Sequence, residues 1–388
     1  MTGIERPPRR IAVVTNLCTH YRRPLFERLS NRFDADFYFT STGTERYWSS
    51  DHTLDVGALR VISAPHSWSL AWRMATRDYD CVLVTLAGRL KLLATIAGVL
   101  ARGRPFVLWV GIWSHPRTTF HRLTHPLIRR LYRMADAVLV YGPHVEGHVV
   151  RESGRRDRIF VAPQAIDNAR FNVEPATETL QDARSMLADD FRFVAAFVGR
   201  LVPEKGIEDL VRAISLTHER VGLALIGSGP EERNLRQLAS ELGVDRRVSF
   251  VGYVGQQRLP ALLRFCNVLV LPSVTTTRFK EPWGFVANEA MAAGLPVVAT
   301  DAVGAVAGGL VTDEETGLVV PEGRPRVLAS ALDRLANSPV LAHRLGSAGR
   351  ERVGAWTYEA AVSGIEDAIE CAISHAKRGA SGARLARA

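Results

Sequence analysis

Two glutamates eight residues apart, Glu281 and Glu289, bracket a Pro-Trp-Gly turn about two thirds of the way along the chain. The proline that follows Glu281 restricts this residue to an extended backbone, so Glu281 lies ahead of the helix predicted after Gly284. Glu289 falls about one turn inside that helix, and both carboxylates can face one crevice. The helix start around Phe285 and Val286 offers N–H groups that suit a phosphate. Two acids able to bind sugar hydroxyls beside a phosphate indicate a nucleotide-sugar site.

Two cations precede these acids. A predicted strand ends at Gly199, a short loop carries Arg200 and Lys205, and a helix begins near Gly206. Arg200 and Lys205 can converge on a diphosphate, where charge-assisted hydrogen bonds are strongest. Such cations stabilise the negative charge that develops on a departing nucleoside diphosphate. A pair of solvated loop cations is the alternative interpretation.

The strings at 199–206 and 279–298 resemble the G-R-x4-K-G and E-x7-E signatures of retaining glycosyltransferases of family 4, which have the GT-B fold. The resemblance is close across residues 191–320 and is one of architecture before them. It implies that Arg200 and Lys205 contact the donor diphosphate. Glu281 would then bind the donor sugar and Glu289 the ribose.

The family's mechanism needs no enzymic nucleophile, because the acceptor hydroxyl attacks from the face that the diphosphate leaves and the β-phosphate takes its proton. It also implies no metal, and in a suitable loop the sequence has neither a D-x-D motif nor a His/Asp cluster. We therefore expect no cofactor besides the nucleotide-sugar substrate. The alternative for the two acids is an ordinary turn glutamate and an ordinary helix-surface glutamate.

Further donor contacts are expected from two turns. Gly227 and Gly229 follow a strand predicted at 221–226, and Pro230 stands where a dinucleotide fingerprint has its third glycine. The resemblance makes both glycines candidates for close backbone approach to the donor. It also places the nucleobase near Tyr253 or Val254, although core packing is an equally good interpretation for Tyr253.

The first half of the chain has fewer motifs that point to a specific chemistry. After the first strand the chain lacks the glycine-rich turn of many relatives and carries His20, Arg22 and Arg23 instead, which we assign to the acceptor side together with Trp113. The same absence of G-x-G-x-x-G argues against a dehydrogenase. His115 is the candidate for a histidine that the family places beside the transferred sugar, and a loop histidine ordered by the next proline is the alternative.

The net charge of +9 belongs to residues 1–180, because residues 181–388 hold equal numbers of basic and acidic side chains. Five of the seven tryptophans lie in the same half, and the stretch 120–133 is basic and amphipathic. An anionic membrane surface or a lipid-linked phosphate fits this charge, and a solvated helix face fits it equally well. No nucleic-acid motif accompanies the charge, so we expect no nucleic-acid partner.

Strand-like runs alternate with helical stretches throughout, which is typical of α/β proteins with parallel sheets. The predicted class is α/β in the GT-B architecture, two Rossmann-like doubly wound domains facing across a cleft. We expect an acceptor domain over 1–180, a donor domain over 181–376 and a disordered tail over 377–388, with a linker at 172–190. Strands are expected at 11–15, 36–40, 61–64, 81–86, 106–110, 137–141, 159–162, 191–198, 221–226, 248–251, 268–271, 296–299 and 317–319.

The four cysteines are scattered without ligand spacing, and no signal peptide or membrane span is recognised, so a cytoplasmic protein is expected. Peripheral contact with the inner face of the membrane is the alternative location. The predicted activity is transfer of a hexose-type sugar from a nucleoside-diphosphate sugar to an acceptor hydroxyl. A lipid-linked or envelope-glycan acceptor is the first choice and a small natural product the second. A GT-B epimerase or phosphorylase and a non-catalytic sugar-binding relic are the alternatives from other classes.

Overall fold

The computed structural model describes residues 7–41, 56–87, 89–173, 176–187, 191–218 and 220–385, and its contacts divide the chain into two compact units. Unit 1 consists of the N-terminal part up to Gly111, of Leu123–Pro163 and of the C-terminal segment from Tyr358. Unit 2 consists of Ile112–Arg122 and Gln164–Thr357.

Unit 1 is built on a parallel sheet of six strands in the order β2-β1-β3-β4-β5-β6. The central strands are near-continuous runs of Val, Ile, Leu and aromatic residues, as expected for parallel strands covered on both faces. The strands are β1 (Arg10–Thr15), β2 (Asp34–Phe39), β3 (Cys81–Thr85), β4 (Phe106–Val110), β5 (Ala137–Val140) and β6 (Ile159–Val161). The helices are α1 (Arg23–Arg32), α2 (Ser67–Thr76), α3 (Arg89–Ala101), α4 (Thr119–Met134), α5 (Pro143–Ser153) and α14 (Tyr358–Leu385). The first turn of α4, up to Arg122, is counted with unit 2.

Unit 2 has a second parallel sheet of six strands in the order β12-β11-β10-β7-β8-β9. Its strands are β7 (Phe193–Val198), β8 (Val221–Ile226), β9 (Val248–Gly252), β10 (Val268–Leu271), β11 (Val297–Thr300) and β12 (Leu318–Val320). Apolar clusters fill both faces of this sheet. Its helices are η1 (Asn168–Phe171), α6 (Thr177–Ser185), η2 (Pro203–Lys205), α7 (Ile207–Leu216), α8 (Glu232–Glu241), η3 (Asp245–Arg247), α9 (Leu259–Leu263), α10 (Val286–Ala292), α11 (Gly304–Ala307), α12 (Pro325–Asn337) and α13 (Pro339–Val353).

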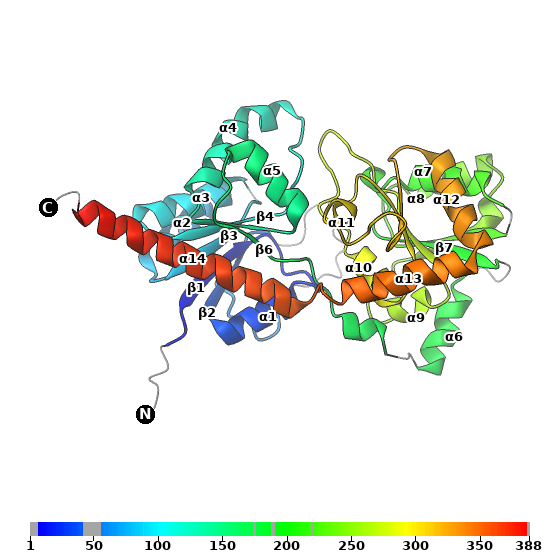
Figure 1. Cartoon of the computed structure of the whole chain (residues 1–388), viewed down its shortest axis with the longest axis horizontal. Coiled ribbons are helices and arrows are strands. Elements are labelled where there is room, and N and C mark those ends of the chain that lie inside the picture. Colours follow the sequence, from blue (N-terminus) through cyan, green and yellow to red (C-terminus); the bar gives the residue numbers. More distant parts are fainter. Residues whose placement is uncertain are drawn as a thin grey trace. The chain divides into compact units, whose positions relative to one another are not determined.

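The helix α14 returns the end of the chain to unit 1 (Figure 1). Its apolar stripe, which includes Ile365 and Ile369, is fully buried. At Gly364 a Cβ atom would lie 2.0 Å from the carbonyl oxygen of Val161 in β6, so only glycine allows this close approach. The predicted boundaries at 180 and 376 therefore differ from the structural division, because the sequence gives the apolar stripe of α14 but not the sheet that buries it.

Most predicted strands are confirmed within one or two residues at each end. The strand expected at 61–64 is wrong: Val61 forms only an isolated bridge to Phe37. The disordered tail expected at 377–388 is wrong up to Leu385, since α14 continues to that residue. The linker expected at 172–190 contains the helix α6. Two residues of that expected linker, Pro175 and Asp190, lie outside the described residues, and so does Trp48, one of the five tryptophans of the first half.

Candidate functional site

The two acids and two cations singled out by the sequence all lie in unit 2, near the carboxyl ends of β7 and β10. The Lys205 ammonium pairs with Oε2 of Glu281, although 76 residues separate them in the sequence. Both side chains are largely buried, 18% exposed for Lys205 and 8% for Glu281. The fold thus joins the predicted diphosphate cation to the predicted sugar acid.

The contact between Lys205 and Glu281 depends on a glycine next to the lysine. Gly206 follows η2 with φ of +64°, and a Cβ atom there would lie 2.0 Å from the carbonyl oxygen of Pro272. The loop that carries Lys205 therefore packs directly on the backbone after β10. The backbone N–H of Val274 donates to the carbonyl oxygen of Glu204 at 3.1 Å and fixes the same approach.

The Glu281 carboxylate has a second partner in the same segment. The hydroxyl of Ser273 donates to Oε2 of Glu281 at 3.3 Å, and the hydroxyl of Thr300 donates to the carbonyl oxygen of Ser273 at 2.5 Å. Ser273, Thr300 and Glu281 are all buried. Sequence analysis did not single out Ser273 or Thr300, yet each lies at the carboxyl end of a parallel strand, where ligands of such sheets bind.

The backbone of Glu281 is held by a segment from far earlier in the chain. Trp113 Nε1 donates to the carbonyl oxygen of Glu281 at 2.9 Å, and the Lys280 ammonium lies 3.9 Å from the centre of a Trp113 ring. The segment Ile112–Arg122 belongs to unit 2 for this reason, together with the 2.7 Å hydrogen bond from the Arg117 N–H to the carbonyl oxygen of Thr277. The partly buried His115 lies two residues beyond Trp113 on this segment.

We expect Trp113→Phe to lower the free energy of unfolding by about 1 kcal/mol, because it removes one partly buried hydrogen bond while keeping an aromatic ring under Lys280. Trp113→Ala should cost more, since the ring is lost as well. Thermal unfolding checks this, with Trp72→Phe at an exposed position as the matched control. Equal transition temperatures for Trp113→Phe and wild type would show that the hydrogen bond contributes nothing.

The turn between the acids is fixed by buried groups. Trp283 is 2% exposed, and its Nε1 donates to Oδ1 of Asn288 at 2.8 Å. The fully buried Asn288 in turn donates through Nδ2 to the carbonyl oxygen of Gln164 at 2.9 Å. Gly284 has φ of +94°, which a residue with a side chain rarely adopts. Phe285 is the N-cap residue, and the helix starts at Val286, so the predicted helix start is confirmed.

Glu289 lies in the first turn of α10 and is only partly exposed. Burial raises the pKa of its carboxyl group to about 7, and the charge of Arg170 opposes this shift. Arg170 comes from η1 and donates through Nη1 to Oε1 of Gln256 at 3.0 Å. Gln256 follows Tyr253 and Val254 in the loop after β9, so Arg170 connects the predicted base loop with the predicted ribose acid. Sequence analysis missed Arg170 because it falls at the edge of the segment assigned to a linker.

The glycines of the turn after β8 are required by close backbone packing within unit 2. A Cβ atom at Gly227 would lie 1.8 Å from the carbonyl oxygen of Gly199, and one at Gly229 would lie 2.2 Å from that of Leu201. These glycines bring the loop of Arg200 against the loop after β8, which places the partly buried Arg200 at the carboxyl edge of β7. In the base loop Tyr253 is 55% exposed and is not a core residue, while Val254 packs against the core.

The residues assigned to the acceptor side are divided between the units. Arg22 lies in unit 1, where it donates through Nη1 to the Thr15 hydroxyl at 3.1 Å and through Nη2 to the Tyr141 hydroxyl. Its guanidinium also lies 4.9 Å from the centre of a Trp109 ring. Arg23 pairs with Glu27 at 2.8 Å, and the His20 ring meets its neighbour Tyr21 edge to face. Trp113 belongs to unit 2 instead.

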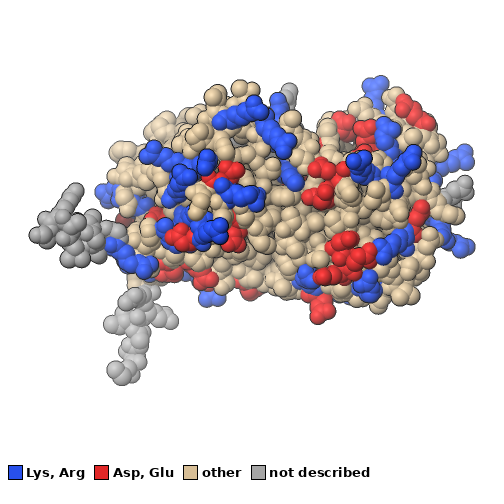
Figure 2. All heavy atoms as spheres, turned by 45° about the horizontal axis from the view of Figure 1, so that its top comes forward, with Lys and Arg blue, Asp and Glu red and all other residues tan. Residues whose placement is uncertain are grey.

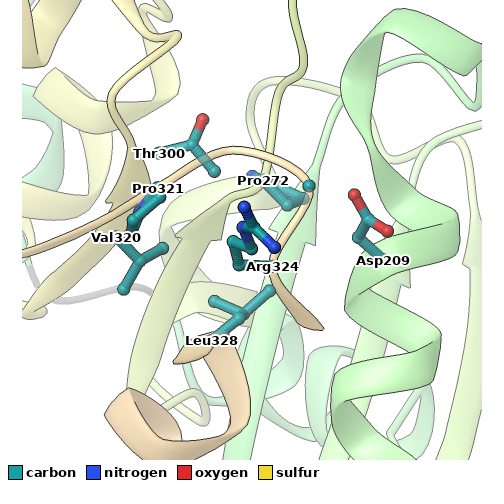
Figure 3. A pocket seen from close by; sticks show the side chains of 8 residues that line it. Asp209, Pro272, Thr300, Val320, Pro321, Arg324 and Leu328 are labelled. Carbon is teal, nitrogen blue, oxygen red and sulfur yellow. The ribbon is translucent and has the colours of Figure 1, made fainter. Parts of the chain in front are cut away.

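A small pocket lies beside the ends of β10, β11 and β12 (Figure 3). It is lined by Asp209, Pro272, Thr300, Val320, Pro321, Gly323, Arg324 and Leu328. In Figure 3 the Asp209 side chain of α7 extends from one wall towards Arg324. Burial raises the pKa of Asp209. None of the predicted donor residues lines this pocket.

In the described part of the chain, no group of three or more His, Cys, Asp or Glu side chains is placed to hold a metal ion. Metal independence stays a prediction. The described helices include none that is both long and apolar enough to cross a membrane.

Comparison with known proteins identifies the family. A profile of the family described as Glycosyl transferases group 1 matches residues 181–352. Over 303 residues the chain is 30% identical to the GDP-mannose-dependent alpha-(1-6)-phosphatidylinositol monomannoside mannosyltransferase of Mycobacterium tuberculosis, and the alignment covers 76% of each protein. The chain belongs to the glycosyl transferases group 1 family. The resemblance expected from the sequence is thereby confirmed.

Two further proteins are similar to this member of the glycosyl transferases group 1 family. It is 33% identical over 246 residues to the D-inositol 3-phosphate glycosyltransferase of Streptomyces griseus, and the match covers 59% of this chain and half the length of that relative. The crystal structure of HepE from Anabaena in complex with UDP and glucose superposes with a TM-score of 0.77 at 19% identity, covering 93% of this chain and 99% of that one. This likeness confirms the GT-B fold class with its two Rossmann-like units.

Proposed function

We propose that this chain transfers a hexose-type sugar from a nucleoside-diphosphate sugar to an acceptor hydroxyl, with retention of the anomeric configuration. The observation that carries the proposal is the buried pair of Lys205 and Glu281 in a member of the glycosyl transferases group 1 family. A cation for the leaving diphosphate and an acid for the sugar lie side by side, as the transfer requires. The donor class is supported by the GDP-mannose in the name of one relative and by the UDP and glucose bound to a protein of the same fold.

The roles follow from charge and position. The Lys205 ammonium has three donors, so it can keep Glu281 and still bind a phosphate oxygen. Together with Arg200 it stabilises the charge on the departing diphosphate. Glu281 accepts hydrogen bonds from donor-sugar hydroxyls, and the ionised Glu289 accepts them from the ribose. The acceptor proton passes to an oxygen of the β-phosphate, so no residue of the chain has to act as a nucleophile.

For the acceptor we propose a lipid-linked or cell-envelope glycan, handled at the cytoplasmic face of a membrane. The supporting observations are the phosphatidylinositol monomannoside in the name of the mycobacterial relative and the basic charge of residues 1–180. The name of the Streptomyces relative specifies D-inositol 3-phosphate, and that observation favours a small anionic acceptor as the second candidate.

A thermal-shift panel of UDP-, GDP-, dTDP- and ADP-sugars with the free diphosphates tests the donor site. A ligand at a hundredfold excess over its Kd stabilises the folded protein by about 2.7 kcal/mol. We expect a shift with one base family in the wild type, and none in Arg200→Ala or Glu289→Ala, while Arg246→Ala at an exposed position behaves as wild type. The anomeric form of the product, read by proton NMR, then tests retention.

The absence of a thermal shift with every ligand of the panel would contradict the donor proposal and favour the non-catalytic sugar-binding relic. Turnover of a donor without any added acceptor hydroxyl, giving an epimerised sugar, would favour the epimerase instead.

A further inference from the structure

The helices α2, α3 and α4 cover one face of the unit 1 sheet. From the edge strand β2 the chain moves to β3, β4 and β5 in one direction across the sheet, and right-handed crossovers place the connecting helices on the same face. The opposite face is covered by α14, which packs along β3, β4, β5 and β6 and against α1 (Figure 1). By the same rule the step from β5 to β6 places α5 on the face of α2, α3 and α4. The outward sides of α2, α3 and α4 are here named the α2–α4 surface.

Large apolar side chains are exposed on the α2–α4 surface. Trp68 and Trp72 are 71% and 66% exposed and lie one helical turn apart on α2. Exposed leucines continue the surface over α3 and α4, at Leu90, Leu93, Leu100, Leu123 and Leu127. Each helix also has a separate buried side, for example Leu70 and Met74 of α2. The core is complete without the exposed side chains, and exposed apolar groups gathered in this way mark an interaction site.

The helices α2 and α3 pack directly against each other on this surface. At Gly98 of α3 a Cβ atom would lie 2.3 Å from the carbonyl oxygen of Ala71 in α2. Such contact of one helix with the backbone of the other holds the exposed tryptophans of α2 in a fixed place beside the leucines of α3. The apolar side chains are therefore presented by a packed pair of helices and not by a loop.

The α2–α4 surface is rich in basic side chains, although the carboxylate of Glu152 in α5 lies beside it, 2.6 Å from Nε2 of His125 in α4. The three helices contain no Asp or Glu, and the described basic side chains that they contribute to unit 1 are Arg73, Lys91, Arg129, Arg130 and Arg133. On α4, Arg129 and Arg133 donate to the backbone carbonyl oxygens of Glu152 and Ser153 at 2.6 and 2.9 Å. Among the described residues no arginine of α4 forms an ion pair with a carboxylate, and the acid that pairs with α4 is Glu152, which contacts His125.

The opposite face of unit 1 differs in this respect. Carboxylates of α14 pair there with arginines, as in Glu370 with Arg9 at 2.6 Å and Glu359 with Arg28 at 3.0 Å. Figure 2 shows more Lys and Arg than Asp and Glu on the side of unit 1 that faces the viewer. The arginines of α4 and the exposed apolar groups of α2 and α3 thus lie on the face of the sheet opposite α14.

We propose that the α2–α4 surface docks unit 1 on an anionic lipid bilayer, with Trp68 and Trp72 at the level of the head groups and the arginines of α4 beside lipid phosphates. Indole rings favour the boundary between hydrocarbon and water. Each Lys or Arg near an anionic surface strengthens the attraction to that surface. The sequence predicted membrane contact for the basic first half of the chain, with its tryptophans and the stretch 120–133 as candidates. The proposal assigns that contact to one face of unit 1 and adds the leucines of α3.

Two other occupants fit less well. A second copy of the chain in a two-fold contact would place the α2–α4 surfaces of the two copies against each other. The arginines of the two α4 helices would then repel one another. Nucleic acid would satisfy the arginines, but five exposed leucines have no role against a polar phosphate backbone. A bilayer satisfies both features at once, and the inference needs no assumption about the reaction.

Cosedimentation with vesicles tests the proposal. We expect the wild-type chain to bind vesicles of phosphatidylcholine with about a third phosphatidylglycerol, to bind pure phosphatidylcholine far less, and to be released by salt. The double variant Trp68→Ser/Trp72→Ser should bind at least about tenfold more weakly, and so should Arg130→Glu. The matched controls in unit 2, Val327→Ser/Val340→Ser and Arg326→Glu, should bind as wild type. All altered side chains are exposed, so these variants should fold.

Three results would overturn the proposal. The first is no binding of the wild type to anionic vesicles, and the second is unchanged binding by the tryptophan variant. The third is a wild-type dimer in sedimentation velocity that Trp68→Ser/Trp72→Ser converts to a monomer, since this would assign the surface to a second copy. Because vesicle binding needs no donor, failure here and failure of the donor panel are separate outcomes.

Discussion

Replacement of Lys205 by methionine should lower kcat by about 10²- to 10³-fold, the usual loss when one charge that stabilises the transition state is removed. The same change leaves the buried carboxylate of Glu281 without its cation, so the free energy of unfolding should fall by up to about 3 kcal/mol. Steady-state kinetics with the donor identified by the thermal-shift panel, together with thermal unfolding, measures both effects. Lys377→Met on α14 is the matched control and should change neither.

The two effects can be separated by a second substitution. In Lys205→Met/Glu281→Gln no buried charge is left unpaired, so we expect most of the lost stability to return. Turnover should stay low, because neither the cation for the diphosphate nor the acid for the sugar is restored. Recovery of turnover in the double variant would show that the pair is only structural, and wild-type kcat in Lys205→Met would remove Lys205 from the reaction.

Glu289→Gln should stabilise the folded protein above pH 7 while abolishing donor binding. Burial raises the pKa of the Glu289 carboxyl from its ordinary value of 4.5 to about 7. Between these values the folded protein holds a proton that the unfolded chain has released, so the free energy of unfolding falls as pH rises through this window. The full effect is on the order of 3 kcal/mol. Glutamine never ionises, and the variant avoids this loss.

Thermal unfolding at pH 5 and pH 8 measures this linkage. The difference in transition temperature between Glu289→Gln and wild type should be small at pH 5 and positive at pH 8. Glu351→Gln, at an exposed position of α13, is the matched control and should show no such difference. A Glu289→Gln variant that is no more stable than wild type at pH 8 would mean that Glu289 ionises as an ordinary surface acid.

The same group links donor binding to pH. If the ionised Glu289 accepts hydrogen bonds from the ribose, donor affinity should rise as pH increases through about 7. The charge of Arg170 lowers the pKa of Glu289, so Arg170→Met should move this rise to higher pH, and Arg170→Lys should restore it in part. An Arg170→Met profile that coincides with that of wild type would remove Arg170 from this role.

Much of the unit 2 site could be predicted from the sequence. The turn after Glu281 is a local matter, because proline restricts the residue before it and Gly284 allows a positive φ that other residues avoid. The helix start at Val286 and the buried stripe of α7 follow from short-range pattern in the same way. Such features depend on neighbours within a few residues, and these neighbours are visible in the sequence.

The partners of these residues could not be predicted. Nothing in the sequence indicates that Lys205 pairs with Glu281, that Trp113 donates to the Glu281 backbone, or that Arg170 lies near Glu289. The pKa of Glu289 likewise depends on how completely α10 is buried. These are contacts between segments far apart in the chain, and their geometry is set by how loops and helices pack around the parallel sheet of unit 2.

The amino-acid sequence by itself determined the α/β class, most strands, the signature residues of unit 2 and the excess of positive charge in residues 1–180. The tertiary structure alone decided that α14 returns to unit 1, that Ile112–Arg122 belongs to unit 2, and that acid-free helices expose tryptophans and leucines on one face. The physical reason is the range of the interactions. Backbone preference and apolar periodicity act locally, whereas the choice of which sheet buries a stripe, and which face remains exposed, is made by the burial of the whole chain.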